Sequence, residues 1–559
     1  MTIITAVEYK TQLMKHCSEA ASTIHAECAE ILAAKDQYDQ VTIIETSVAG
    51  CGTALVELLS RQANIVHGLY ENHLQTNTGA PEISSTQKDN LALKRLEDIA
   101  SIAYSKFYAY LFKDLPVYWR QLYTDARILK FCLLLLRSPY AAVQHEPDRA
   151  TFENAVAGVH RHDCLDELVK TLDLALILAG AAGEQRGRRW IDKALELLHF
   201  IWVAESKGQD VDNSSAARHT RPAKRAKLSG DHEASNMDDA HLTSATFSTH
   251  EPFTPPVTHP IRKTEALSID EFQTYMDRPR DPKLGPEPLI IRGTLSEWPA
   301  LSTRPWNRPS YLLSQTFGGR RLVPVEIGRS YVDEGWGQKL LTFGEFLHTY
   351  IDPTSVHSTT NPPPTHTNPA PHNTTLPLNP TAYLAQHQLF TQLPSLRADI
   401  LIPDYCYTAP PPHPLSPTLA QPELAAPLLN AWLGPPGTIS PLHTDPYHNV
   451  LAQAVGRKYV RLYAPRETPR LAARGRERGV EMGNTSRVDV GVLEGWDAGK
   501  NGGSEEGGEA MSEEEIEAFK AIPFVDCILE PGDALYIPIG WWHYVRGLSV
   551  SFSVSFWWN

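Results

Sequence analysis

His443 and Asp445 are separated by a single residue, in a stretch that is rich in Pro and Gly. On a β-strand, side chains two residues apart point to the same face, so this imidazole and this carboxylate would converge. Two histidines and one carboxylate on one side of an iron leave three coordination positions open, the facial triad of non-haem Fe(II) oxygenases. The pair is therefore a candidate metal site that needs a second histidine.

His543 is the candidate for the third ligand. It follows two Pro/Gly turns that flank the strand-like run Ala534–Ile537, and the second turn would aim it inward. His448 competes for the role, but at five residues from His443 it would point to the opposite strand face, so we expect it in a loop or in solvent. The predicted metal ligands, which are also the predicted catalytic residues, are His443, Asp445 and His543.

Oxygen activation at such a triad needs an electron source, which a 2-oxoacid can supply while it chelates the metal. Its far carboxylate then needs a cation, because an unpaired charge in a dry pocket is costly. Lys458 begins a strand-like run and is the natural partner, whereas Arg457 and Arg461 would lie on the other face of that run. The sequence thus predicts Fe(II) as the metal, with a 2-oxoacid and O2 as co-substrates.

Residues 253–559 must form the elements that position these side chains. Short β-rich runs alternate there with Pro/Gly turns, which is typical of a sandwich or barrel. The final run, Leu548–Trp558, alternates large apolar residues with Ser, so a Ser-lined inner face would suit a polar ligand. Three inserts, near 352–380, 408–426 and 495–517, are predicted to be surface loops without chemistry.

Residues 1–205 are predicted to form an all-helical domain. Leu96, Ile99, Ala103, Phe107 and Tyr110 recur at the spacing of one helix face. Such stripes fit a simple helical core, and they also fit a TPR-like or partner-docking array, although no repeat is visible.

Residues 206–252 lose this periodicity and are predicted to be a disordered linker. The linker carries the basic run Arg218–Leu228, which predicts recognition by a nuclear import receptor.

Composition excludes several classes of function. The 559 residues carry 51 Lys and Arg against 65 Asp and Glu, a net charge of −14, so direct binding to nucleic acid is not expected, whereas basic protein tails are suitable partners. The seven Cys form no CxxC pair, which argues against a zinc finger or a disulfide framework. The most apolar run, 131–136, is far shorter than the roughly 20 residues of a membrane span.

Several segments resemble the JmjC-domain Fe(II)/2-oxoglutarate oxygenases. They are Val323–Gly328, Tyr383–Phe390, Ile402–Cys406, Ala431–Pro435, Gly456–Tyr463 and the stretch from His543 to Trp558. Within the family, the chain is most similar to the small nuclear member with a helical N-terminal domain, known both as a lysine demethylase and as a protein arginyl hydroxylase. The resemblance implies a multidomain α + β protein, in which the helical domain precedes a JmjC double-stranded β-helix (cupin-like) barrel.

The resemblance also implies roles for further residues. For 2-oxoglutarate, it implies contacts of Lys458, Ser440 and Tyr405 with the distal carboxylate and of Asn449 near the iron. For the substrate pocket, it implies Glu326, Tyr331 and Trp432. Glu326 could pair with a guanidinium and Trp432 could stack on it. Two of these residues also have plainer interpretations, since Trp432 could be a core residue and Glu326 an exposed acid.

The expected function is Fe(II)- and 2-oxoglutarate-dependent hydroxylation of an arginyl side chain in a protein. One alternative is Nε-methyl-lysine demethylation of histones, which would release formaldehyde. A second alternative is a non-catalytic chromatin-interaction module. The expected partners are a basic peptide, a histone or another nuclear or ribosomal protein, with the import receptor as a further partner and neither nucleic acid nor membrane. The expected location is the nucleus, with the cytoplasm second.

Overall fold

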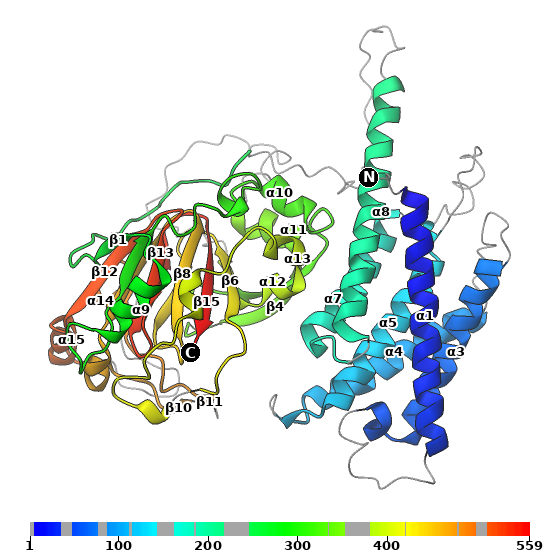
Figure 1. The fold of residues 1–559 in the computed structure, drawn as a ribbon, viewed down its shortest axis with the longest axis horizontal. Helices are drawn as coiled ribbons and strands as arrows, with labels where there is room; N and C mark the ends of the chain where they lie inside the picture. The colour runs from blue at the N-terminus through cyan, green and yellow to red at the C-terminus, as the bar shows by residue number, and fades with distance from the viewer. Residues whose placement is uncertain are drawn as a thin grey trace, which may run out of the picture. The chain divides into compact units, whose positions relative to one another are not determined.

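The computed structural model describes residues 5–34, 47–75, 87–110, 114–141, 161–183, 186–216, 245–333, 335–352, 381–419, 421–477, 480–498 and 511–559. The chain divides into two compact units (Figure 1). The first unit comprises residues 1–234 together with 320–322, and the second comprises 235–319 and 323–559. Each unit is described by itself.

The first unit is helical, which confirms the prediction for this half of the chain. Its helices are α1 (Ala6–Ala33), α3 (Thr53–Gln75), α4 (Gln87–Phe107), α5 (Val117–Leu136), α7 (Arg161–Ala179) and α8 (Gly187–Ala216). Three residues of the predicted stripe, Leu96, Ile99 and Ala103, form the buried face of α4. The prediction was wrong for Tyr110, which follows the end of α4 and is exposed. Helix α5 packs against α1, α4 and α7. None of the helices in the described segments is long and apolar enough to cross a bilayer.

The predicted linker is shorter than expected at both ends. Helix α8 continues to Ala216, past the boundary predicted at residue 205. At the other end, Phe247 is already buried, and Glu251 pairs with Arg457 at 2.8 Å. Residues 245–252 therefore belong to the second unit. The basic run 218–228 lies outside the described residues.

The second unit is built on two sheets. Its strands are β1 (Lys263–Glu265), β2 (Leu289–Arg292), β3 (Leu322–Ile327), β4 (Gly337–Thr342), β5 (Ala382–His387), β6 (Leu428–Gly434), β7 (Ile439–His443), β8 (His448–Val455), β9 (Lys458–Tyr463), β10 (Arg476–Glu477), β11 (Val480–Glu481), β12 (Phe524–Leu529), β13 (Ala534–Ile537), β14 (Trp542–Gly547) and β15 (Ser551–Trp558). The larger sheet has the order β1-β2-β13-β8-β15-β6-β5-β3-β4, and the smaller has the order β12-β9-β14-β7. Strands β10 and β11 form a separate hairpin.

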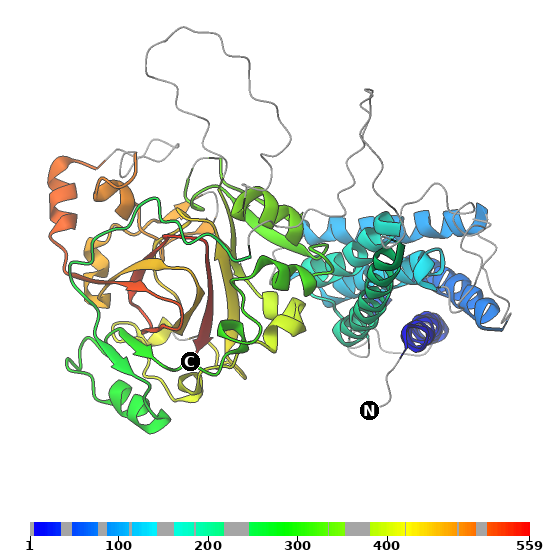
Figure 2. The ribbon, with the colours of Figure 1, turned by 90° about the horizontal axis from the view of Figure 1, so that it is seen from above.

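The two sheets enclose a barrel, as the sequence predicts for this half of the chain. Figure 2 shows the strands curving around a common centre. Apolar side chains of both sheets pack together at one end of this interior: Leu451 and Leu535 come from the larger sheet, and Val460 and Val545 from the smaller. Because facing sheets bury their inner side chains against each other, this cluster holds the barrel closed.

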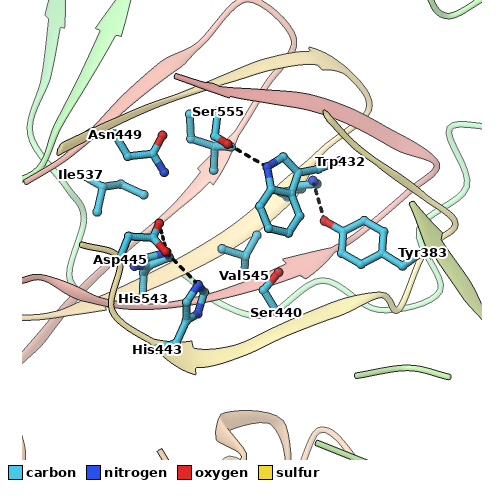
Figure 3. Close-up of a pocket in the computed structure, with 12 residues that line it drawn as sticks. Tyr383, Trp432, Ser440, His443, Asp445, Asn449, Ile537, His543, Val545 and Ser555 are labelled. Carbon is cyan, nitrogen blue, oxygen red and sulfur yellow. Dashed lines mark hydrogen bonds and ion pairs between the residues drawn. The ribbon is translucent and has the colours of Figure 1, made fainter. Parts of the chain in front are cut away.

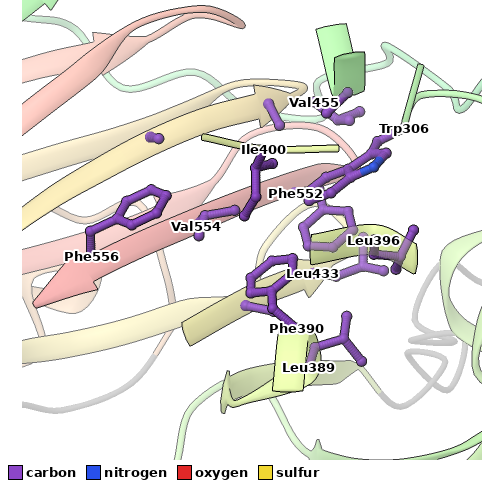
Figure 4. Close-up of a cluster of buried hydrophobic side chains, with 14 of the residues drawn as sticks. Trp306, Leu389, Phe390, Leu396, Ile400, Leu433, Val455, Phe552, Val554 and Phe556 are labelled. Carbon is purple, nitrogen blue, oxygen red and sulfur yellow. The ribbon is translucent and has the colours of Figure 1, made fainter. Parts of the chain in front are cut away.

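Large apolar residues and serines alternate along β15 and lie on opposite faces of the strand, as predicted. Phe552, Val554 and Phe556 of β15 are fully buried in a cluster outside the barrel (Figure 4). The serines between them point the other way, into the barrel. The outer cluster is covered by short helices, which include α9 (Ile269–Asp277), α10 (Pro309–Ser314), α11 (Phe343–Phe346), α12 (Leu389–Gln392) and α13 (Pro394–Arg397).

The structure bears differently on the three inserts that were predicted to be surface loops. Most of the first, 353–380, lies outside the described residues. The second contains one short 3₁₀ turn, η10 (Pro417–Leu419). The prediction of a loop was wrong for the acidic end of the third, where helix α15 (Glu513–Lys520) begins. Ser512 and Glu515 form a capping box that satisfies the first backbone N–H groups, so the acids stabilise a helix start.

Candidate active site

His443, Asp445 and His543 come together inside the barrel (Figure 3). The Nε2 atom of His443 lies 3.7 Å from Oδ1 of Asp445, and that of His543 lies 3.5 Å from Oδ2. The three potential ligand atoms all lie within 4.8 Å of one another, close enough for a single ion. The prediction that His443 and Asp445 share one face of a strand is correct only in part. Strand β7 ends at His443, and Asp445 lies in the turn that follows.

Backbone contacts fix the orientation of both imidazoles. Nδ1 of His443 donates to the carbonyl of Pro441 at 2.7 Å, and Nδ1 of His543 donates to the carbonyl of Trp541 at 3.1 Å. A carbonyl can only accept, so each hydrogen resides on Nδ1 and each Nε2 presents a lone pair to the centre. This arrangement, with one ring nitrogen tied and the other free, is how histidine ligands are usually held.

The electrostatics of the three groups also suit a divalent cation. Burial and the neighbouring His543 lower the pKa of His443 to about 4, so this imidazole is neutral and able to bind metal near pH 7. Burial alone would raise the pKa of Asp445, but its interactions with His543 and His443 outweigh burial and hold the pKa below its usual value. Two imidazole nitrogens and one carboxylate then face one point, the donor set expected for Fe(II).

A small cavity extends from the triad into the barrel. Its lining residues are Tyr383, Trp432, Ser440, His443, Asp445, Asn449, Leu451, Lys458, Ile537, His543, Val545 and Ser555. Ser555 is one of the inward-facing serines of β15 and accepts a hydrogen bond from the Trp432 indole at 2.9 Å (Figure 3). Trp432 is therefore a wall of the cavity and not part of the apolar core.

Lys458 is a buried cation in the wall of this cavity. Its ammonium donates to the hydroxyl of Tyr383 at 3.2 Å, and burial lowers its pKa to about 7. No carboxylate in the described part of the chain is ion-paired with it. A buried ammonium that faces a cavity without a counter-ion is well suited to the carboxylate of a ligand.

Ser440 and Asn449 line the cavity as the resemblance implies. Ser440 lies beside Tyr383, next to Lys458, whereas Asn449 lies beside Asp445 at the metal end. The Oδ1 atom of Asn449 is buried and has no partner in the described segments. A buried acceptor without a partner costs free energy, so it favours a ligand that can donate a hydrogen bond or bind through a metal ion.

Tyr405 does not reach the cavity, which corrects the role implied for it. Its hydroxyl donates to the carbonyl of Leu267 at 2.9 Å and accepts from the Leu267 N–H at 3.0 Å, and its ring packs on Phe272 outside the barrel. The tyrosine beside Lys458 is instead Tyr383 on β5. Strand β5 pairs with β6, and the ring centroids of Tyr383 and Trp432 lie 5.9 Å apart. This pairing joins distant parts of the sequence, so local residue spacing does not reveal it.

His448 is buried and is not in solvent, which corrects a second expectation. Its Nε2 donates to the carbonyl of Pro411 and its Nδ1 accepts from the Tyr536 hydroxyl, both at 2.9 Å. It points away from the triad, as the strand argument predicts, so it is not a ligand.

The residues expected to bind substrate lie beside the cavity. Glu326 and Tyr383 are register partners on β3 and β5, so their side chains share the face of the sheet that Tyr383 turns to the cavity. Burial raises the pKa of Glu326, although a hydrogen bond from Trp336 opposes this effect. Burial raises the pKa of Tyr331, and the charge of nearby Asp445 adds to this effect. The Tyr331 hydroxyl is 3.3 Å from Thr485 Oγ1. No sequence pattern indicated a role for Trp336 or Thr485.

A buried facial triad in a double-sheet barrel defines a cupin-type metal-dependent oxygenase. The comparisons agree, since residues 280–559 match the family model described as a cupin-like domain. The chain therefore belongs to the cupin-like JmjC-domain family of Fe(II)/2-oxoglutarate oxygenases, which confirms the resemblance seen in the sequence. Because this is a family of enzymes, the chain is an oxygenase, which argues against the non-catalytic interpretation.

The relatives carry names from the same family. "Lysine-specific demethylase 8" of Danio rerio is 29% identical over 469 residues, which cover 84% of this chain and 88% of that protein. This match is longer than the barrel, so it extends into the helical half. "Lysine-specific demethylase JMJ30" of Arabidopsis thaliana is 37% identical over 54% of each chain. "Jumonji C domain-containing protein 5" of Drosophila melanogaster is 34% identical over 57% of this chain and 65% of that protein.

Proposed function

We propose that the protein removes methyl groups from Nε-methyl-lysine side chains of a protein substrate. The observation that carries this proposal is that several relatives are lysine-specific demethylases by name, one of them matched along most of both chains. They favour the demethylase alternative over the arginyl hydroxylation expected first. Bound Fe(II) would supply oxidation of the methyl C–H bond at the expense of 2-oxoglutarate and O2, with succinate, CO2 and formaldehyde as products.

The chain's own residues bind and orient the reactants. His443, Asp445 and His543 would hold the metal, and their fixed tautomers need no rearrangement on binding. Lys458 would pair with the distal carboxylate of 2-oxoglutarate, because it is the buried cation that faces the cavity. Val545 and Ile537 supply apolar walls that help to exclude water.

Hydroxylation of an arginyl side chain is a second candidate, which Glu326 favours. A half-buried carboxylate beside Tyr383 and Trp432 combines a charge partner with aromatic surfaces. A planar guanidinium can bind a carboxylate through two N–H groups and stack on an indole, whereas a methylated ammonium gains less from a carboxylate than from an aromatic cage. Both reactions would use the same metal site.

One experiment separates the two candidates. The protein is loaded with Fe(II) and 2-oxoglutarate, and arginine-bearing and methyl-lysine-bearing histone-tail peptides are followed by mass spectrometry and a formaldehyde assay. Demethylation gives a loss of methylene mass together with formaldehyde, whereas hydroxylation adds one oxygen without formaldehyde. If the peptides gain oxygen and no formaldehyde forms, the demethylase proposal is wrong.

We further propose that the substrate is a basic nuclear protein such as a histone, and that an import receptor carries the chain into the nucleus. The support is the acidic net charge of −14 and the basic run Arg218–Leu228. A reporter fused to residues 215–230 should accumulate in the nucleus. A reporter that stays in the cytoplasm would contradict the import proposal and leave the enzymatic one untouched.

A further inference from the structure

Residues 408–424, which make up most of the Pro-rich insert predicted at 408–426, are anchored by hydrogen bonds at both ends. Near its start, Ala409 exchanges two hydrogen bonds with the amide of Gln273 on α9, at 2.8 and 2.9 Å. Near its end, the side chain of Asn559 accepts from the N–H of Leu424 and donates to the carbonyls of Gln421 and Pro422, each at 3.0 Å. A segment with few backbone N–H groups of its own is thus held by side chains of the barrel.

Between these ties, the insert contacts the strand that carries Asn449. The carbonyl of Pro411 accepts from Nε2 of His448 at 2.9 Å, and Tyr536 holds the other ring nitrogen. His448 is only 1% exposed and is the first residue of β8, directly before Asn449 in the cavity wall. The start of β8 is therefore fixed from outside the barrel by the insert and from within the sheet by Tyr536.

The insert also contacts the turn that precedes His543. The ring of His413 lies against Gly540, so a Cβ at Gly540 would collide with it. Gly540 has a φ of +82°, which favours glycine at the position. The ring itself is held by its own loop, since Nδ1 of His413 accepts from the N–H groups of Leu415 at 3.2 Å and Ser416 at 3.1 Å.

We propose that the 408–424 insert is a positioning brace for the metal centre. It acts through His448 and Gly540, because none of its described residues lines the cavity and none belongs to the apolar clusters of the barrel. The insert should therefore contribute more to metal affinity than to fold stability, since ligand geometry is sensitive to small displacements of its supports. This inference rests on the metal site of the proposed function.

The first test measures Mn(II) binding to the full chain without 2-oxoglutarate, by electron paramagnetic resonance. His413→Ala should weaken Mn(II) binding roughly tenfold, the scale of outer supports of metal ligands, while the Tm of the metal-free chain changes little. Leu415→Ala is the matched control, because this side chain belongs to the same loop and is 51% exposed. Unchanged affinity, or a fall in Tm that accounts for the lost affinity, would overturn the brace.

The second test asks whether the contact itself transmits the effect. Gly540→Ala should displace the His413 ring and weaken Mn(II) binding, and the His413→Ala/Gly540→Ala double variant should be no weaker than the weaker single variant. Effects that multiply would mean that the two positions act independently, and would overturn the proposal.

A third pair keeps the proposal testable if Gly540→Ala fails to fold. His448→Gln retains a donor for Pro411 and an acceptor for Tyr536, so it should bind Mn(II) better than His448→Leu. Equal affinity of these two variants would contradict the brace. A wild-type chain that bound no Mn(II) would instead overturn the metal site itself, an outcome distinct from failure of the brace alone.

Discussion

His443 and His543 are register partners across the antiparallel pair of β7 and β14, and their ring centroids lie 4.2 Å apart. One hundred residues of sequence separate them, yet the ladder places them directly opposite each other. A register irregularity between His543 and Val545 follows immediately, as is common where a strand aims a functional side chain. Strand pairing and the short turn to Asp445 thus assemble the triad.

Removal of either histidine should abolish metal binding. His443→Ala and His543→Ala each delete one of three ligands, so Mn(II) affinity should fall by more than about 100-fold, given that mere supports of ligands contribute about 10- to 100-fold. Isothermal titration calorimetry provides the measurement. His250→Ala, at an exposed position, is the control. Retention of tight binding in both histidine variants would show that the metal site lies elsewhere.

Replacement of Lys458 should have two opposite effects. Lys458→Met removes a buried cation without a carboxylate partner, so the ligand-free protein should gain stability, by about 1–4 kcal/mol on the scale of buried charges replaced by apolar residues. The same variant should lose 2-oxoglutarate binding while it keeps Mn(II). Urea denaturation and calorimetry test the two effects. The control is Lys520→Met on the exposed side of α15, which should change neither stability nor 2-oxoglutarate binding. A Lys458→Met variant that binds 2-oxoglutarate normally would contradict this assignment.

The lowered pKa of Lys458 predicts that 2-oxoglutarate binding depends on pH. Because an anionic ligand binds the charged ammonium, the affinity for 2-oxoglutarate should be highest below about pH 7. Above that pH it should decline, by at most about tenfold per pH unit. Near pH 8, binding should take up a proton, which calorimetry in buffers of different ionisation enthalpy detects. Absence of proton uptake would mean that Lys458 is already charged without the ligand.

The Lys458 ammonium should also make the stability of the ligand-free protein depend on pH. Its pKa is about 7 in the folded chain and 10.5 ordinarily, so between these values the unfolded chain binds more protons. The contribution of Lys458 to stability should therefore rise with pH from about 7 to 10.5. The difference in urea stability between the wild type and Lys458→Met should shrink over this window. A constant difference would contradict the lowered pKa.

Tyr383 and Tyr405 offer a matched pair of substitutions. Tyr383→Phe removes the hydroxyl that accepts from Lys458, so 2-oxoglutarate affinity should fall by about 0.5–1.5 kcal/mol, as for a typical hydrogen bond. Tyr405→Phe removes bonds to the Leu267 backbone, so it should lower stability by a similar amount and leave 2-oxoglutarate affinity unchanged. Reversal of these two results would restore the role implied for Tyr405 by the resemblance.

Glu326→Gln should weaken peptide oxidation more than turnover of 2-oxoglutarate without peptide. The carboxylate lies beside the cavity and, within the described segments, forms no hydrogen bond or ion pair with the triad or Lys458, so only recognition of a cationic side chain should suffer. The measurement is the KM for the peptide, which should be higher for the variant than for the wild type. Glu423→Gln, at an exposed position, is the control. Equal loss of both activities would assign Glu326 a structural role.

Local patterns in the sequence predicted the parts of the site that depend on short spacing. The step from His443 to Asp445, the turn before His543 and the position of Lys458 at a strand start each involve a few residues. The same is true of the Ser face of β15, where period two alone placed Ser555 toward the ligand space.

Features that depend on strand pairing could not be predicted in this way. Tyr383 lies beside Lys458 only because β5 joins the larger sheet, whereas the resemblance implies Tyr405 for this role. His448 was expected in solvent because the insert that supplies Pro411 offered no pattern to connect the two. The acidic composition of residues 513–517 suggested a loop, whereas the cap at Ser512 begins a helix.

The central place of β15 in the larger sheet bears on how the protein is made. β15 lies between β6 and β8, although both precede it in the chain by many residues. While a ribosome extends the chain, those two strands have emerged but have no partner to join them, and unpaired strand edges are prone to self-association. A nascent chain thus holds an open sheet until β15 is synthesised, and a chain truncated before β15 would keep the facing edges of β6 and β8 unpaired.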